Sequence, residues 1–289
     1  QMINFTIPAT GSSGHIGGGI LLAAMLGPHA AFLTLAVVLA IQCLFFADGG
    51  LLALGCNIFN MGFYACFIAY PYIFKPIVRK RPGAKSIAVA SAASATAGLL
   101  LGAFSVVLET LASGITELPF SAFITLMLPI HLAIGIGEGI ITGAVLCFVL
   151  QMRPELLDFS GIGETNAENQ GLLSFKKTLA TLLVLAALVS GGLSLFASAY
   201  PDGLEWSMEK VAGTSELERD GGAYKAASEI QEATAFMPDY DFKSAGEEGS
   251  AFGTGTAGIV GGALTLGVAC AVGAILNASI KRKEKNAAA

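Results

Sequence analysis

The sequence predicts an all-α polytopic membrane protein with about six to seven transmembrane helices. The chain is 54% hydrophobic and only 13% charged, whereas a soluble domain carries roughly 25% charged residues. Six apolar runs are also at least as long as the roughly 18 residues that an α-helix needs to cross a bilayer. Basic residues are confined to a few short segments between these runs, as expected for the loops of a multi-pass protein.

The six apolar runs follow one another along the whole chain. They are residues 29–46, 51–74, 86–113, 119–152, 178–199 and 255–278. A shorter run, GGGILLAAMLG, precedes them at residues 17–27. It is too short to span a bilayer by itself, so the predicted number of helices remains six to seven.

The positions of the basic residues predict the orientation. Residues 1–74 contain no Lys or Arg, and most basic residues lie in 75–85, 153–177 and 281–285. If the first of these segments is cytoplasmic, the alternation of spans places the other two on the same side, as the positive-inside rule requires. We therefore expect a multi-pass protein of the cytoplasmic membrane of a prokaryote, with its C-terminus inside.

In this scheme the segment 200–254 lies outside. It carries twelve acidic and four basic residues, a net charge of −8, whereas the whole chain carries −5. Its sequences DGGAY and SAGEEGSAFGTG are typical of poorly ordered backbone. We expect a solvated acidic loop, which could also attract cations by electrostatic steering.

Polar groups within the apolar runs are candidates for function, because they are costly in a membrane. Asp48 lies in the turn FADGG, and Asn57 and Asn60 lie in GCNIFNMG. Asp48 fits a turn at the membrane surface. The two asparagines could form a buried hydrogen-bond network or contact a ligand.

His131 and Glu138 are two helical turns apart and therefore share one helix face. They lie in PIHLAIGIGEGIITG, where Gly135, Gly137 and Gly139 permit close helix packing. The pair could stabilise this packing or line a translocation path. Because both residues lie in the middle of a run, we predict that neither captures metal at the outer surface.

His15 stands in GSSGHIGGG, a segment with almost no side chains around it. Glycines allow the backbone to leave helical geometry, and such backbone at membrane depth requires a cavity lined by protein. Imidazole is a common ligand for transition metals. The segment lacks the GK[ST] of a phosphate-binding loop, and a histidine held only by hydrogen bonds remains an alternative.

The segments IPATGSSGHIGGGILLAAMLGP, FADGGLLALGCNIFNMG and HLAIGIGEGIITG closely resemble the CbiM/NikM family. Members of this family are the substrate-capture membrane subunits of energy-coupling-factor (ECF) transporters for cobalt and nickel. The segment AYPDGLEWSMEKV resembles the PDGLE domain, a helical hairpin similar to CbiN/NikN. The resemblance implies a metal-capture core over residues 1–177 and a PDGLE hairpin over 178–289, with the loop 200–254.

The resemblance further implies a metal site made of nitrogen atoms. In the family these are the N-terminal amine, the backbone nitrogen and imidazole of the second residue, and the histidine of the SGH motif, which His15 matches. Such a set suits Ni(II) and accepts Co(II). The residues that could support the ligand or line the metal path are Ser13, Asp48, Asn57, Asn60, His131 and Glu138.

This chain begins QMINF, whereas the family begins with Met-His and a further helix, so we expect a segment upstream of Gln1. The transported Co(II) or Ni(II) is the expected ligand, with no resident cofactor and no nucleic-acid partner. The expected partners are the lipid bilayer, a transmembrane coupling subunit and ATP-binding cassette ATPases. A proton-coupled secondary transporter using His131 and Glu138 is the alternative. An intramembrane enzyme is disfavoured because HExxH, GxSxG and paired aspartates are absent.

Overall fold

The computed structural model describes residues 3–81, 83–114, 118–159, 174–215, 221–243 and 251–287. Within these residues, six helical segments are long and apolar enough to cross a membrane: Pro28–Phe46, Leu51–Lys80, Ala84–Ser113, Phe120–Met152, Phe175–Phe196 and Phe252–Ser279. Each overlaps one of the six predicted runs, and the polytopic all-α class is confirmed.

The chain opens with a small hairpin that the sequence did not predict. Strand β1 (Asn4–Ile7) pairs antiparallel with β2 (Ser12–His15), so that Asn4 lies opposite His15. The glycine-rich stretch then leads into the short helix α1 (Gly19–Leu26) and, after a break at Gly27, into α2 (Pro28–Phe46). The expected departure from helical geometry around His15 is therefore an ordered hairpin.

The remaining first half forms a helical bundle. Its second span runs through η1 (Leu51–Ala53), α3 (Leu54–Ile58), the π-helical η2 (Phe59–Phe74) and α4 (Lys75–Lys80). It is followed by α5 (Ala84–Ser113), α6 (Phe120–Met152) and η3 (Pro154–Leu156). The largest apolar cluster lies between α1, η2, α5 and α6.

Close contact between α5 and α6 depends on glycine. A Cβ atom added at Gly139 would lie 2.4 Å from the Cα atom of Ala92, and one at Gly135 would lie 2.7 Å from the Cα atom of Thr96. The prediction that these two glycines permit close packing is confirmed. Gly137 instead faces the ring of Phe5, and its lack of a side chain lets the hairpin pack against the surface of α6.

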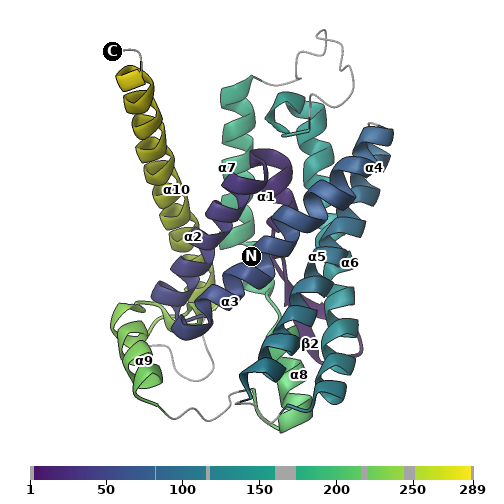
Figure 1. Ribbon diagram of the computed structural model, residues 1–289, viewed down its shortest axis with the longest axis vertical. Coiled ribbons are helices and arrows are strands. Elements are labelled where there is room, and N and C mark those ends of the chain that lie inside the picture. Colours follow the sequence, from purple (N-terminus) through teal and green to yellow (C-terminus); the bar gives the residue numbers. More distant parts are fainter. Residues whose placement is uncertain are drawn as a thin grey trace.

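The second half adds two spans and a group of short helices. Helix α7 (Phe175–Gly191) continues into η4 (Leu193–Phe196), and α10 (Ala251–Ala287) is the last span. Between them lie α8 (Gly203–Ala212), α9 (Gly222–Thr234) and η5 (Pro238–Tyr240). Figure 1 shows α8 and α9 at one end of the molecule, while α4, the start of α7 and the C-terminus lie at the other.

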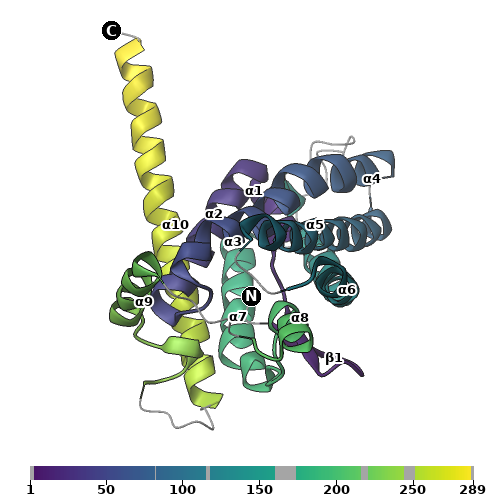
Figure 2. The ribbon, with the colours of Figure 1, turned by 60° about the horizontal axis from the view of Figure 1, so that its bottom comes forward.

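The segment predicted to be a solvated loop is largely folded onto the bundle. Helix α8 packs beside α6 and β2 of the hairpin (Figure 2). Residues Gly222–Tyr224 of the expected disordered stretch begin α9. The expectation of a merely solvated loop is therefore wrong for residues 200–215 and 221–243. Five of its acidic residues lie outside the described residues: Glu216, Glu218, Asp220, Glu247 and Glu248.

Candidate functional site

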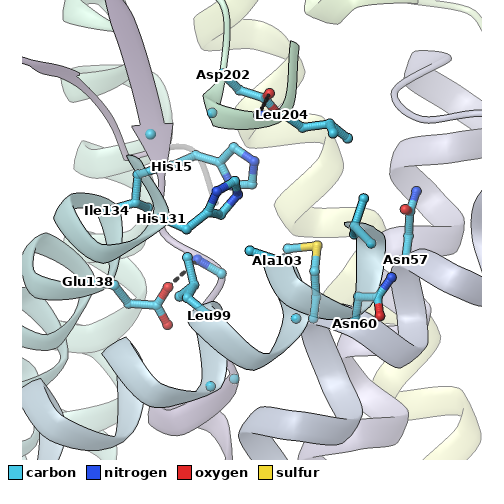
Figure 3. Close-up of a pocket in the computed structure, with 18 of the residues that line it drawn as sticks. His15, Asn57, Asn60, Leu99, Ala103, His131, Ile134, Glu138, Asp202 and Leu204 are labelled. Atoms are coloured by element: carbon cyan, nitrogen blue, oxygen red, sulfur yellow. Dashed lines mark hydrogen bonds between the residues drawn. The ribbon is translucent and has the colours of Figure 1, made fainter. Parts of the chain in front are cut away.

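A cavity of about 280 Å³ lies between the hairpin, the bundle and α8. Six of the seven residues singled out from the sequence line it: His15, Asp48, Asn57, Asn60, His131 and Glu138. Figure 3 shows all of these except Asp48 with labels. They come from β2, the turn after α2, the second span and α6. Residues scattered over the first half of the chain therefore converge on one space.

His15 lies at the end of β2, where the strand leaves the hairpin. Its Nδ1 atom is buried and has no hydrogen-bond partner. A smaller cavity of about 120 Å³, lined in part by Asn4 and Tyr240, also adjoins His15. The imidazole thus faces open space instead of the polar partners that a structural histidine would require.

Glu138 fixes the glycine segment that follows His15. Its side chain is 2% exposed, and its two oxygen atoms accept hydrogen bonds from the backbone N–H groups of Gly17, at 2.9 Å, and Gly18, at 3.1 Å. Gly18 has a φ of +81° and directly precedes α1, a conformation that favours glycine. The carboxylate therefore holds the backbone between β2 and α1 against α6.

His131 lies beside His15 at the cavity wall, and Figure 3 shows the two rings next to each other. The Nδ1 atom of His131 is 2.8 Å from the carbonyl oxygen of Met127, one turn back on α6. The mid-run position of His131 predicted a place away from the site, but His131 lines the same cavity as His15. That it does not capture metal stays a prediction.

The asparagines are arranged differently from one another. The Nδ2 atom of Asn60 donates to Oε2 of Glu109 at 2.8 Å, while its Oδ1 atom is buried without a partner at the cavity. The side chain of Asn57 lies close to Gly49: a Cβ atom added at Gly49 would be 2.9 Å from Nδ2 of Asn57. The predicted hydrogen-bond network is thus present at Asn60, and contact of this pair with a ligand stays a prediction.

Asp48 keeps its predicted place in a turn but also has a partner from the second half. The hydroxyl of Tyr240 donates a hydrogen bond to Oδ2 of Asp48. Burial, together with the neighbouring Asp48 charge, raises the pKa of the Tyr240 hydroxyl. Nearby, Nε2 of Gln231 donates to the carbonyl oxygen of Gly49 at 2.7 Å. The end of α9 and η5 therefore bind the turn that contains Asp48 at the edge of the cavity.

Ser13 does not line the cavity. It is 1% exposed; its N–H donates to the carbonyl oxygen of Pro201 at 2.8 Å, and its hydroxyl to that of Tyr200 at 2.9 Å. The indole N–H of Trp206 donates to the carbonyl oxygen of Thr10 at 3.0 Å. These bonds fasten the hairpin to the chain around α8.

The first turn of α8 supplies cavity residues that the sequence analysis missed: Asp202, Gly203, Leu204 and Glu205. Asp202 caps the helix by accepting from the N–H groups of Leu204 and Glu205, at 2.8 and 2.9 Å. Burial raises the pKa of the Glu205 carboxyl, and the Asp202 charge adds to this shift. The only signal for these residues was the PDGLE motif itself.

The donor atoms at the cavity are imidazole nitrogens, with carboxylates and amides around them. No three His, Cys, Asp or Glu side chains converge to hold a metal ion within the part of the chain that the structure describes. The cavity beside these side chains has room for several water molecules.

The two halves of the chain match two family models. Residues 1–156 match CbiM, described as the cobalt uptake substrate-specific transmembrane region, and residues 176–278 match the PDGLE domain. No solved structure matches the chain.

Similar proteins are named as metal transport proteins. The fused nickel transport protein NikMN of Rhodobacter capsulatus is 31% identical over 54% of this chain and 48% of its own length. The cobalt transport protein CbiM of Sorangium cellulosum is 31% identical over 53% of this chain and 68% of its own. A relative from Archaeoglobus fulgidus that shares the NikMN designation is 36% identical over 55% of this chain. The chain spans only about half of that relative, the matched share being 51%.

Proposed function

Because the chain belongs to the CbiM family and carries a PDGLE domain in its second half, we propose that it captures Co(II) or Ni(II) for import as the membrane subunit of an ECF transporter. The resemblance noted from the sequence is confirmed by both family matches. The relatives are named as nickel and cobalt transport proteins, which supports a transition-metal ion as the transported substrate.

The observation that carries the proposal is the setting of His15. Its imidazole lines a cavity inside a multi-pass bundle, and its Nδ1 atom is buried without a partner. A nitrogen ligand of this type suits Ni(II) and Co(II) and is a poor ligand for Mg(II) or Ca(II). His15 is thus the residue proposed to bind the ion directly.

Energy for import is proposed to come from partner subunits, namely a transmembrane coupling subunit and ATP-binding cassette ATPases. The cavity is proposed to open to the outside of the cytoplasmic membrane, with α8 and α9 outside and the C-terminus inside. The gathering of α4, the start of α7 and the C-terminus at one end supports this orientation, since the basic residues lie in those segments.

The direct test is calorimetric titration of Ni(II) and Co(II) into the complete protein and into its His15→Ala variant, with Mg(II) as the negative control. The native protein should bind one transition metal ion, and the variant should lose most of the affinity while keeping its melting temperature. Equal affinity in a well-folded variant would contradict the role of His15.

A second measurement addresses the source of energy. Cells that express the transporter without its ATPases should not accumulate the metal. Uptake that continues without them would favour the proton-coupled alternative based on His131 and Glu138. The two backbone hydrogen bonds accepted by Glu138 give this carboxylate a positioning role instead.

A further inference from the structure

We propose that the smaller cavity beside His15 is the route by which a hydrated divalent cation enters, and that a hydrogen bond from Tyr240 to Asp48 closes this route. This route rests on the proposed function, because it leads to the larger cavity of about 280 Å³ where His15 would bind the ion.

The smaller cavity lies where the two halves of the chain meet. Four of its lining residues come from the first half and three from the second: Asn4, His15, Gln42 and Asp48, and Ala197, Tyr240 and Thr254. Ala197 directly follows η4, and Thr254 lies in the first turn of α10. Figure 1 shows the start of α10 at the same end of the molecule as α8 and α9. The smaller cavity is therefore on the side proposed to face outward.

The two cavities share part of their walls. His15, Gln42 and Asp48 line both of them. Asp48 is an exposed residue, so water and ions can reach it from outside, whereas Nδ1 of His15 is buried. An ion that passes Asp48 into the smaller cavity thus comes directly to the imidazole.

The polar atoms of the smaller cavity suit an ion that still carries its water. Oδ1 of Asn4 is buried without a partner, and Gln42 and Thr254 add further oxygen atoms to the walls. Buried polar atoms that lack protein partners are normally satisfied by water. Because water molecules bound to a divalent cation donate hydrogen bonds, these acceptors would surround hydrated Ni(II) or Co(II) without displacing its inner shell.

Tyr240 is positioned to close this route. Its hydroxyl donates a hydrogen bond to Oδ2 of Asp48 and forms another with Gln42. Its ring stacks on Phe46, with the ring centres 5.0 Å apart. Tyr240 and the preceding Asp239 both have positive φ, of 61° and 52°, a conformation that non-glycine residues keep only where their surroundings hold them. The hydroxyl is thus fixed on two of the shared residues, and an ion that passes Asp48 must first break its hydrogen bond.

A gate of this kind affects the rates of binding and release more than the affinity. The hydrogen bond is intact before and after the ion passes and is broken only during passage, so it raises the barrier equally in both directions. A hydrogen bond to a charged group is strong enough to slow each rate roughly 10- to 100-fold. If Tyr240 only fastened the second half to the first, its loss would lower the melting temperature without accelerating either rate.

The experiment uses the complete protein in detergent, with a purification tag that lacks histidine, and Ni(II) as the probe. Stopped-flow mixing with a weak chromophoric indicator measures association, and mixing of loaded protein with excess EDTA measures dissociation. Tyr240→Phe keeps the stacked ring but removes the hydroxyl, so both rates should rise roughly 10- to 100-fold while Kd stays unchanged. Tyr200→Phe is the matched control, because Tyr200 is 54% exposed and lines neither cavity. It should change neither rate.

A second variant tests the route itself, since direct entry into the larger cavity past the first turn of α8 is the competing route. Thr254 lines the smaller cavity but not the larger one. Thr254→Cys, placed in a cysteine-free background, should bind Ni(II) at the rate of that background. After modification with a bulky maleimide, it should lose most of its association rate, because the adduct fills the smaller cavity.

The outcomes distinguish the gated route from the proposed function. Unchanged rates in a well-folded Tyr240→Phe variant would overturn the gate, and so would a weaker affinity without faster association. Association at full rate in the modified Thr254→Cys protein would overturn the route. These results leave the role of His15 intact if the native protein binds Ni(II) and His15→Ala does not. If the native protein binds neither Ni(II) nor Co(II), the proposed function is wrong as well.

Discussion

Removing the Glu138 carboxylate should release the glycine segment that follows His15. Each oxygen atom of Glu138 accepts one backbone hydrogen bond, from Gly17 or from Gly18. A hydrogen bond to a charged group contributes about 1.5–3 kcal/mol, so the two bonds contribute about 3–6 kcal/mol. Gly17 and Glu138 both line the cavity, where water can replace part of the loss. We therefore expect a cost at the lower end, about 3 kcal/mol, for Glu138→Ala.

Glu138→Gln should cost about half as much, because its amide oxygen can accept from one glycine while its NH₂ group cannot accept from the other. Since about 1.4 kcal/mol corresponds to a factor of ten, amide exchange at Gly17 and Gly18 should accelerate roughly 100-fold in the alanine variant and roughly tenfold in the glutamine variant. Hydrogen exchange followed by NMR on ¹⁵N-glycine-labelled protein resolves both amides.

Glu209→Gln is the matched control, because Glu209 is an exposed residue of α8 that does not line the cavity. It should leave both exchange rates unchanged. If the two glycine amides exchanged equally fast in Glu138→Ala and in the native protein, Glu138 would not anchor this segment. The positioning role assigned to it would then be refuted.

Three further predictions follow from topology, packing and charge. A cysteine at Ser215, placed in a cysteine-free background, should react with a membrane-impermeant maleimide added to intact cells; protection there would reverse the proposed orientation. Gly139→Ala should lower the melting temperature, because the new Cβ would lie 2.4 Å from the α5 backbone. The control Gly262→Ala should leave the melting temperature unchanged, because no atom lies within 4 Å of its new Cβ. Equal melting temperatures of the two variants would contradict the packing argument. Burial opposes ionisation of Asp158, but hydrogen bonding and attraction by Lys75 outweigh it and lower its pKa. The stability that the ionised Asp158 contributes should thus be present above its unfolded pKa of about 4, and it should be lost as the pH falls through its lower folded pKa. Asp158→Asn should remove this component of acid unfolding. Identical profiles of stability against pH in the two proteins would contradict the contribution of Asp158.

The sequence predicted those features that depend on local composition. The six spans agree with the apolar runs because hydrophobic length is a property of a continuous segment. The packing at Gly135 and Gly139 followed from small residues on one helix face. The non-helical backbone around His15 followed from its glycines, although the strand pairing of Asn4 with His15 did not.

The features that were missed depend on contacts between distant parts of the chain. Gly17 and Glu138 are 121 positions apart, and no local pattern indicates that the hairpin reaches the middle of α6. The same contact brings His131 beside His15. Asp202 and Glu205 also line the cavity only because α8 packs on the hairpin, which the acidic composition of segment 200–254 does not reveal.

The contacts of the hairpin explain how His15, the proposed ligand, is held in a segment so poor in side chains. Glycine backbone is costly to order, yet the residues around His15 are fixed on three sides. The pairing with β1 holds Ser12–His15, Glu138 holds the two N–H groups that follow, and Pro201 accepts from the N–H of Ser13. Folding has therefore already met the entropic cost of ordering this segment, so that little of it remains to oppose binding at His15. Because the third contact comes from the segment that leads into α8, the second half of the chain helps both to cover the cavity and to hold its imidazole in position.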